Sequence, residues 1–412
     1  MKTLLLSVIL ILGNTSALAE SLLITDARLI EEGLSSNINY DILVSGGVIN
    51  RIGEDLSGAA ADTVINAASR PVTGAFFAGI TALGLNEIGM VSDTVDSRLA
   101  DLYTGLIHPE FDVREAYNPH SSAIPVTRIE GFGYTLLGAS PGDRPLSGHG
   151  SLVRLDGGFN SFEGKSVMYA DVSGPSGDKL GGSRAASWML LNAIFAELTT
   201  ADKDLKLMTA QGKSALADAK KNGIFIFSAH RASDIVRVLE FKAERGLNAV
   251  ISGGQEAWMV REELAAAEVP VIINALDNLP GSFDALGARL DNAALLHDAG
   301  VTVLFTSGET HNARKLRQVA GNAVAHGLPH KAAMAAMTSL PASLFGGLDR
   351  SLQRGSRADL VIWSGDPLDV NSAADTVIIG GKVDTMQSRQ TYLLQRYLPE
   401  EPGRGRAYIN PQ

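Results

Sequence analysis

The stretch from 223 to 252, GIFIFSAHRASDIVRVLEFKAERGLNAVIS, decides the fold because it holds a strand, a helix and a second strand in succession. Its apolar run Gly223–Phe227 predicts a buried strand, and the spacing of apolar residues over 232–245 predicts an amphipathic helix. Asn248–Ser252 predicts the next strand. Continuous apolar strands joined by helices are typical of a parallel sheet covered on both faces.

Further units of this kind follow along the chain. Strands are expected at Asn248–Ser252, Val269–Ile273 and Val301–Phe305, and helices at 255–267, 283–299 and 314–325. Four successive strand-helix units predict an α/β fold with a (β/α)8 TIM-type barrel, which carries its functional side chains at the carboxyl ends of the strands. A doubly wound sheet has the same local pattern of strands and helices, but it usually has a glycine-rich phosphate-binding motif, which this sequence lacks.

Both ends of the chain are β-rich. Strands are expected at Ser21–Leu29, Tyr40–Ile49 and Ala358–Trp363, with tight turns at Gly46-Gly47 and Gly380-Gly381. Two such segments around a different middle predict one small β-sandwich domain built from both termini. The expected organisation is a signal peptide at 1–19, sandwich segments at 20–70 and 351–395, the barrel at 71–350 and a C-terminal tail at 396–412.

The N-terminus carries an expected export signal. Lys2 is followed by the apolar run Leu4–Gly13 and by Ala17-Leu18-Ala19, a small-residue cleavage site. About ten apolar residues are too few for a membrane-spanning helix, which needs roughly 20. A buried strand is the alternative explanation. The pattern predicts an exported, periplasmic protein that begins near Glu20 and has no membrane span.

Composition limits the classes of function. The 412 residues are 45% hydrophobic and 19% charged, with a formal net charge of −10. An acidic chain without a basic stripe is a poor candidate for binding nucleic acid. The sequence has no cysteine, so disulfides, thiolate chemistry and cysteine zinc ligands are excluded.

The resemblance to a known family rests on three motifs. They are Pro71-Val72-Thr73-Gly74, Gly355–Trp363 (GSRADLVIW) and Thr376–Lys382 (TVIIGGK). With these the chain, over 21–395, resembles the amidohydrolase superfamily, especially its imidazolonepropionase-like and dihydroorotase-like members. The resemblance implies a barrel with a small β-sandwich and hydrolysis of non-peptide carbon–nitrogen bonds. It also implies one or two divalent metals, which activate water as hydroxide.

The family's metal ligands lie at strand ends, and the resemblance assigns positions to them here. Ile80 and Ala82 stand at the His-x-His positions, and the fourth strand, 166–172, ends at Asp171 instead of Lys or Glu. Glycine, Gly253 or Gly254, stands where the sixth strand should supply His, and Gly308 or a neighbour stands where the eighth should supply Asp. The one match is His230, after the fifth strand. A single ligand does not hold catalytic zinc, which takes three protein ligands and a water.

A rebuilt site around His230 is one hypothesis. His230, Glu309 and His311 (or Asp171) could form a three-ligand site of mixed nitrogen and oxygen donors for one divalent metal, zinc by the resemblance. Glu309 and Asp171 are also the candidates for a catalytic carboxylate. The alternative is that His230 lines a pocket and that the segment after the eighth strand caps a helix through Thr310 or Asn312.

Three further residues are candidates for binding substrate. Arg128 could pair with a carboxylate, although an ion pair with Glu130 or another structural acid explains it equally. His149 is expected in a loop near the barrel mouth, where it contacts ligand or solvent. Trp258 either packs or offers a stacking surface for a ring.

Two functions of different classes therefore stay open. One is a hydrolase of the amidohydrolase lineage with a reduced metal site. The other is a catalytically inactive relative that binds a small molecule, or that forms a homo- or hetero-oligomer with a related amidohydrolase. The second predicts a mouth filled by Phe77, Ile80 and Ala82.

Overall fold

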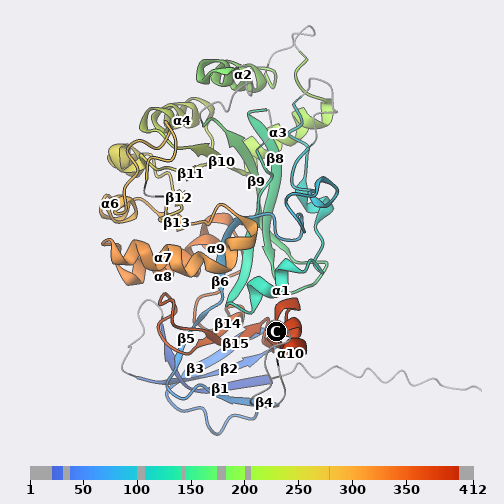
Figure 1. Cartoon of the computed structure of the whole chain (residues 1–412), viewed down its shortest axis with the longest axis vertical. Helices are drawn as coiled ribbons and strands as arrows, with labels where there is room; N and C mark the ends of the chain where they lie inside the picture. The colour runs from blue at the N-terminus through green and yellow to red at the C-terminus, as the bar shows by residue number, and fades with distance from the viewer. Residues whose placement is uncertain are drawn as a thin grey trace, which may run out of the picture.

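The computed structural model describes residues 21–30, 38–99, 107–141, 144–173, 182–199, 206–277 and 279–398. The expected signal peptide and the end of the expected C-terminal tail lie outside these ranges. Figure 1 shows two parts, with the barrel above and a smaller β-sheet part, built from both ends of the chain, below. None of the helices in the described ranges is long and apolar enough to cross a membrane.

One eight-stranded sheet forms the barrel, and its strands neighbour one another in chain order. They are β6 (Phe76–Thr81), β7 (Phe132–Leu137), β8 (Leu146–Arg154), β9 (Phe162–Asp171), β10 (Ile224–Ala229), β11 (Ala249–Gly253), β12 (Val271–Ile273) and β13 (Val303–Phe305). The first and last strands meet through side chains that follow β13. Thr306 Oγ1 accepts a hydrogen bond from the Ile80 amide at 3.2 Å, and Thr310 Oγ1 accepts one from the Ala82 amide at 2.9 Å.

The eight-stranded barrel is confirmed, but the expectation that all its strands are parallel is wrong at one strand. β8 pairs antiparallel with both β7 and β9, whereas β6–β7 and every pair from β9 to β13 are parallel. The reason is the short connection between β8 and β9, residues 155–161, because a parallel neighbour needs a crossover of a dozen or more residues.

Helices cover the barrel on the side of β10 to β13 (Figure 1). The helices are α1 (Ala123–Arg128), α2 (Arg184–Ala196), α3 (Ala210–Asn222), α4 (Ala232–Arg245), α5 (Arg261–Ala266), α6 (Asn292–Asp298), α7 (Leu316–Ala325), α8 (His330–Met337), α9 (Ser339–Phe345) and α10 (Arg389–Tyr397). The four expected strand-helix units are present. Two helices are shorter than expected: η4 (Ala257–Val260) precedes α5, and α6 begins at Asn292 because an irregular segment, interrupted by Pro280-Gly281 and Gly287, precedes it.

The small part combines both ends of the chain, as expected. Its strands are β1 (Ser21–Leu29), β2 (Tyr40–Ser45), β3 (Val48–Gly53), β4 (Thr63–Asn66), β5 (Pro71–Gly74), β14 (Leu360–Trp363), β15 (Ala374–Ile379) and β16 (Lys382–Val383). The first half of β1 pairs with β2 and β4, and its last residues pair with β5. Between the two halves the register shifts, and Asp26 takes a positive φ of 55°. This irregularity lets one strand serve both halves of the sandwich.

The two expected glycine turns pack against each other. Gly46 and Gly47 have φ of 61° and 80°, and Gly380 and Gly381 have φ of 57° and 78°. Such angles suit the tight turn of a two-residue hairpin. A Cβ on Gly47 would lie 3.0 Å from the Gly380 carbonyl oxygen. Contact between the turns therefore needs glycine for space as well as for conformation.

A buried guanidinium joins the barrel to the small part. The side chain of Arg350 is fully buried; its Nη2 lies 2.7 Å from Glu163 Oε1 on β9, and its Nε donates to Asp359 Oδ2 at 3.0 Å. The Tyr134 ring of β7 lies 4.0 Å from its charged carbon. Two carboxylates and an aromatic face thus replace the water that burial removes.

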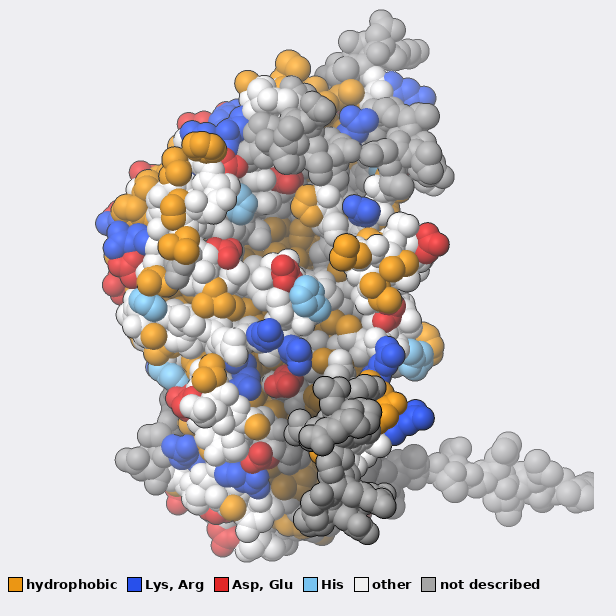
Figure 2. Space-filling view, viewed as in Figure 1, with side chains coloured by type: hydrophobic (Ala, Val, Ile, Leu, Met, Phe, Trp, Pro, Cys, Tyr) orange, Lys and Arg blue, Asp and Glu red, His pale blue; other side chains and the backbone are white. Residues whose placement is uncertain are grey.

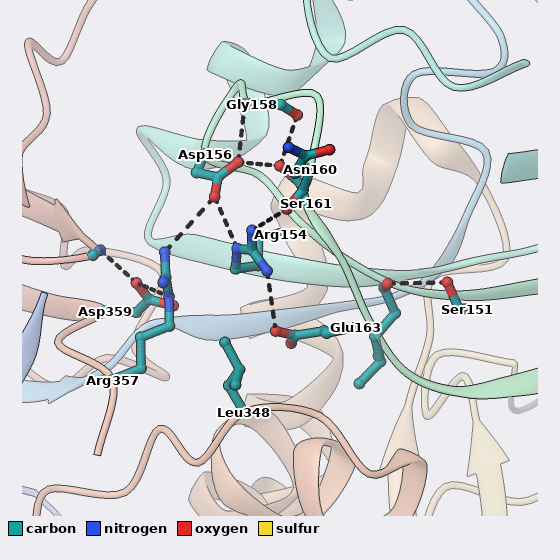
Figure 3. Close-up of polar contacts among 12 residues, drawn as sticks. Ser151, Arg154, Asp156, Gly158, Asn160, Ser161, Glu163, Leu348, Arg357 and Asp359 are labelled. Atoms are coloured by element: carbon teal, nitrogen blue, oxygen red, sulfur yellow. Dashed lines mark hydrogen bonds and ion pairs between the residues drawn. The ribbon is translucent and has the colours of Figure 1, made fainter. Parts of the chain in front are cut away.

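Further ion pairs close this contact into a ring of alternating charge. Arg357 Nε donates to Asp359 at 2.8 Å, and its Nη2 lies 3.7 Å from Asp156. Arg154 donates to Asp156 at 2.8 Å and lies 3.7 Å from Glu163. Figure 3 shows Asp156 between Arg154 and Arg357. The ring, which Arg350 completes, links the β8–β9 hairpin of the barrel to the segment that enters β14.

Replacing Arg350 with Gln should lower the free energy of unfolding by about 3–5 kcal/mol, because Glu163 and Asp359 lose a buried counter-charge. The measurement is urea unfolding followed by circular dichroism. The control is Arg237→Gln, which removes exposed pairs with Glu240 and Glu244 on α4 and should cost about 0–1 kcal/mol. Equal losses in the two variants would contradict a special role for the ring.

Candidate functional site

Three neighbouring barrel strands bring polar side chains together at their carboxyl ends. His230 directly follows β10, Gln255 follows β11, and Asn274 and Asp277 follow β12. Because these strands are parallel and adjacent, their carboxyl ends lie at the same end of the barrel. This end is where barrel enzymes place their chemistry.

Hydrogen bonds connect these side chains into one chain, here called the mouth cluster (His230, Gln255, Asn274 and Asp277). His230 Nδ1 is hydrogen-bonded to Gln255 Oε1. Gln255 Nε2 donates to Asp277 Oδ2 at 3.4 Å, and Asn274 Nδ2 donates to Asp277 Oδ1 at 3.0 Å. An amide oxygen only accepts, so His230 Nδ1 carries the hydrogen, and Nε2 is the basic nitrogen of the neutral ring.

The imidazole lies against the backbone of Gly253. A Cβ at that position would lie 2.4 Å from two atoms of the His230 ring, and Gly253 has a φ of 101°. A side chain at position 253 would therefore displace the His230 ring from this place.

The carboxyl group of Asp277 is tuned by its surroundings. Much of the residue faces solvent, but the partial burial of the carboxyl raises its pKa above the ordinary value of 3.8. Hydrogen bonds from Gln255 and Asn274 and the charge of His230 act against this rise without cancelling it. A carboxyl group at a barrel mouth that is linked by hydrogen bonds to an imidazole is a candidate for proton transfer.

Replacing Gln255 with Leu should raise the pKa of Asp277 further, because the carboxylate loses a donor. Carbon-13 NMR of the aspartate carboxyl groups measures the titration. Gln318→Leu, on the exposed face of α7, is the matched control and should leave the pKa of Asp277 unchanged. An unchanged or lower pKa in Gln255→Leu would contradict the hydrogen-bonded chain.

The raised pKa of Asp277 also determines whether its contribution to stability rises or falls with pH. Between the ordinary and the raised pKa, folded protein binds more protons at Asp277 than unfolded protein does. The contribution of Asp277 to stability therefore falls as pH rises through that window, and Asp277→Asn should remove this pH dependence.

The other proposed metal ligands do not gather around His230. His311 Nε2 lies 3.3 Å from Glu309 Oε2, and the His311 side chain is 80% exposed. Asp171 accepts hydrogen bonds from the amide and hydroxyl of Ser173. Among the described residues no group of three or more His, Cys, Asp or Glu side chains could hold a metal. These residues do not fit the three-ligand centre that the resemblance implies, so we derive no catalytic step through a metal.

The segment after β13 serves barrel closure instead of helix capping. Thr310 accepts the amide of Ala82, as described above, and Asn312 Nδ2 donates to Glu309 Oε2 at 2.5 Å. The backbone amides of Ile80 and Ala82 are thereby tied to the other edge of the barrel.

The proposed substrate-binding residues lie in three different places. Arg128 pairs with Asp384 at 2.5 Å and donates to the Leu155 carbonyl at 2.9 Å, so a structural acid other than Glu130 holds it. His149 lies in β8 and not in a loop; its Nδ1 is 3.0 Å from Ser166 Oγ, and burial lowers its pKa. Trp258 Nε1 donates to the Gly287 carbonyl at 2.8 Å.

Gln255 and Asp277 were not predicted from the sequence as partners of His230. Their places in the sequence could have identified them, since both residues follow predicted strands of the parallel series. Reading every polar residue within about four positions of a strand end would have included them, together with many that play no part.

The chain resembles known proteins in its fold. No protein-family model matches the chain. Amidohydrolase tasK of Hapsidospora irregularis is 31% identical over 115 residues, which is 27% of this chain and 12% of that protein. The chain thus spans a small fraction of that relative's length.

Solved structures give wider coverage. An amidohydrolase from Thermotoga maritima superposes with a TM-score of 0.77 and 20% identity, covering 88% of this chain and 99% of that one. A 5-methylcytosine deaminase from Klebsiella pneumoniae has a TM-score of 0.51 and 16% identity, covering 89% and 98%. An N-isopropylammelide isopropylaminohydrolase from Burkholderia multivorans has a TM-score of 0.50 and 15% identity, covering 88% and 98%. The chain therefore shares the fold of these solved amidohydrolase, deaminase and aminohydrolase structures.

Proposed function

We propose that this chain is an enzyme of the amidohydrolase superfamily that hydrolyses a non-peptide carbon–nitrogen bond at the barrel mouth. Support comes from the fold, which it shares with an amidohydrolase, a deaminase and an aminohydrolase. The observation that carries the proposal is the mouth cluster, in which an imidazole and a carboxyl group at the carboxyl ends of the barrel strands are linked by hydrogen bonds through Gln255.

The two groups divide the proton transfers of hydrolysis. His230 Nε2 takes a proton from water as its oxygen attacks the carbon of the substrate, and Asp277 gives a proton to the leaving nitrogen as the carbon–nitrogen bond breaks. One C–O bond forms and one C–N bond breaks. Exchange with solvent then removes the proton from His230 and restores the one on Asp277.

Gln255 acts as a positioning residue between them. Its oxygen holds the Nδ1 hydrogen of His230 and so directs Nε2 away from Gln255, while its amide nitrogen orients Asp277. Among the described residues no partner of His230 Nε2 is present, which leaves this nitrogen available to water or substrate.

Substituting His230→Gln or Asp277→Asn should each lower kcat/KM by about 10²–10⁴-fold, because each removes one proton-transfer group. The measurement is release of amine or ammonia from a panel of lactams, cyclic amides and N-acyl compounds. The control Asp298→Asn changes an exposed carboxylate at the end of α6 and should retain full activity. Hydrolysis that survives both substitutions would contradict the assignment.

Metal content of the purified protein and of His230→Ala, measured by mass spectrometry, addresses the family's usual cofactor. About one zinc per chain that is lost in His230→Ala would assign Nε2 as a metal ligand in place of a general base. A folded protein that binds panel members without hydrolysing any of them would instead favour the noncatalytic, small-molecule-binding function.

A further inference from the structure

A cavity of about 590 Å³ lies where the barrel meets the small part. Arg128, at the end of α1, and Asp156, in the β8–β9 connection, line it from the barrel. The two glycine turns, Arg357 of the ion-pair ring and the residues from Lys382 to Asp384 line it from the small part. Small-molecule sites have volumes of about 300–1,000 Å³, so the cavity is large enough to hold a small organic ligand.

The glycine turns shape one wall of this cavity. A Cβ at Gly380 would lie 2.9 Å from Arg357 Nη2, so the guanidinium group lies against the bare backbone of the turn. A Cβ at Gly46 would meet no atom within 4 Å. Glycine at position 380 therefore leaves the place that the charged group of Arg357 takes in the wall.

The carboxylates in the wall already accept hydrogen bonds from the protein. Both oxygens of Asp156 accept from the β8–β9 hairpin, and one of the donors is Arg154 Nε at 2.8 Å (Figure 3). Asp384 accepts from Arg128 Nε at 2.5 Å with one oxygen and from the Met386 amide at 2.7 Å with the other. The acceptors of the cavity are thus occupied.

The cationic side chains in the wall, in contrast, have unused donors. Within the described part of the chain, Arg128 Nη2, both terminal nitrogens of Arg357 and Lys382 Nζ donate no hydrogen bond. The Arg128 and Arg357 side chains are only 16% and 21% exposed, so little bulk water reaches them. Unused donors beside occupied acceptors favour a ligand that accepts hydrogen bonds and carries negative charge.

A general attraction of this protein for anions is not expected. The chain has a formal net charge of −10, and Figure 2 shows Lys and Arg side chains interspersed with Asp and Glu over one face of the molecule. An anion that binds must therefore be held by local donors. Arg128, Arg357 and Lys382 belong to three separate segments of the chain, so a ligand that reaches all three carries more than one anionic group.

We propose that this cavity binds a small polyanion with two or more carboxylate or phosphate groups, which contact Arg128, Arg357 and Lys382. The bound polyanion joins the barrel to the small part, in addition to the ion-pair ring. The mouth cluster does not line the cavity, so this inference does not depend on the proposed function.

The test is calorimetric titration of the full chain at low salt with tricarballylate and with pyrophosphate. At least one of the two should bind at one site per chain, at least about tenfold more tightly than acetate, because acetate meets only one of the cations. The tighter of the two probes identifies the anionic group. The neutral triamide of tricarballylate has the same shape without the charges and should not bind.

Three variants locate the site. Lys382→Gln should weaken polyanion binding by about three- to fivefold, and Lys382→Glu by about tenfold or more, because an exposed ion pair is lost and then reversed. Val383→Trp should weaken binding by about tenfold or more, because the indole takes the space of the ligand while the charge is unchanged. Lys221→Gln and Lys221→Glu, on the exposed end of α3, are the matched controls and should bind as the wild type does.

Several results would overturn the proposal. These are the absence of binding by both polyanions, equal binding of the triamide, and equal losses in the Lys221 and Lys382 variants. Polyanion binding that survives both Lys382→Glu and Val383→Trp would place the anion elsewhere and overturn it as well. His230→Gln should bind the polyanions as tightly as the wild type, so failure of the hydrolase assignment and failure of this site are separate results.

Discussion

The fully buried guanidinium of Arg350 is the constraint on which the arrangement of the two parts depends. A charge without access to water needs counter-charges within contact distance, and Glu163 on β9 and Asp359 before β14 provide them. These partners belong to different parts of the chain, so satisfying the charge fixes the small part against the barrel. Arg154, Asp156 and Arg357 extend the contact so that each carboxylate meets two guanidinium groups.

In contrast to this ring of ion pairs, the side chains at the barrel mouth are held together by hydrogen bonds. Gln255 contacts both His230 and Asp277 through its two amide atoms, and Gly253 leaves the space that the imidazole ring takes. A side chain at Gly253 and this position of His230 exclude each other. The glycine at position 253 and the orientation of His230 therefore depend on each other.

Much of the barrel was predictable because its pattern is local. The units β10–α4 and β13–α7 follow from runs of apolar residues and helical spacing alone. The reversal of β8 was not, because Gly148 and Gly150 give Leu146–Arg154 the appearance of a loop, although this segment pairs with a strand on each side. His149 was misplaced for the same reason. The pairing of His230 with Gln255 required knowing which strands are neighbours.

The sharing of β1 by both halves of the sandwich has a consequence for biosynthesis. β5 pairs with β14, and the Trp363 indole donates to Thr73 Oγ1 at 2.8 Å across 290 residues of sequence. The sheet that contains the N-terminal strands therefore cannot be completed until β14 and β15 have been synthesised. The barrel, whose neighbouring strands are consecutive, can assemble during that interval. The small part is therefore completed last, when the segment synthesised first pairs with the segment synthesised near the end.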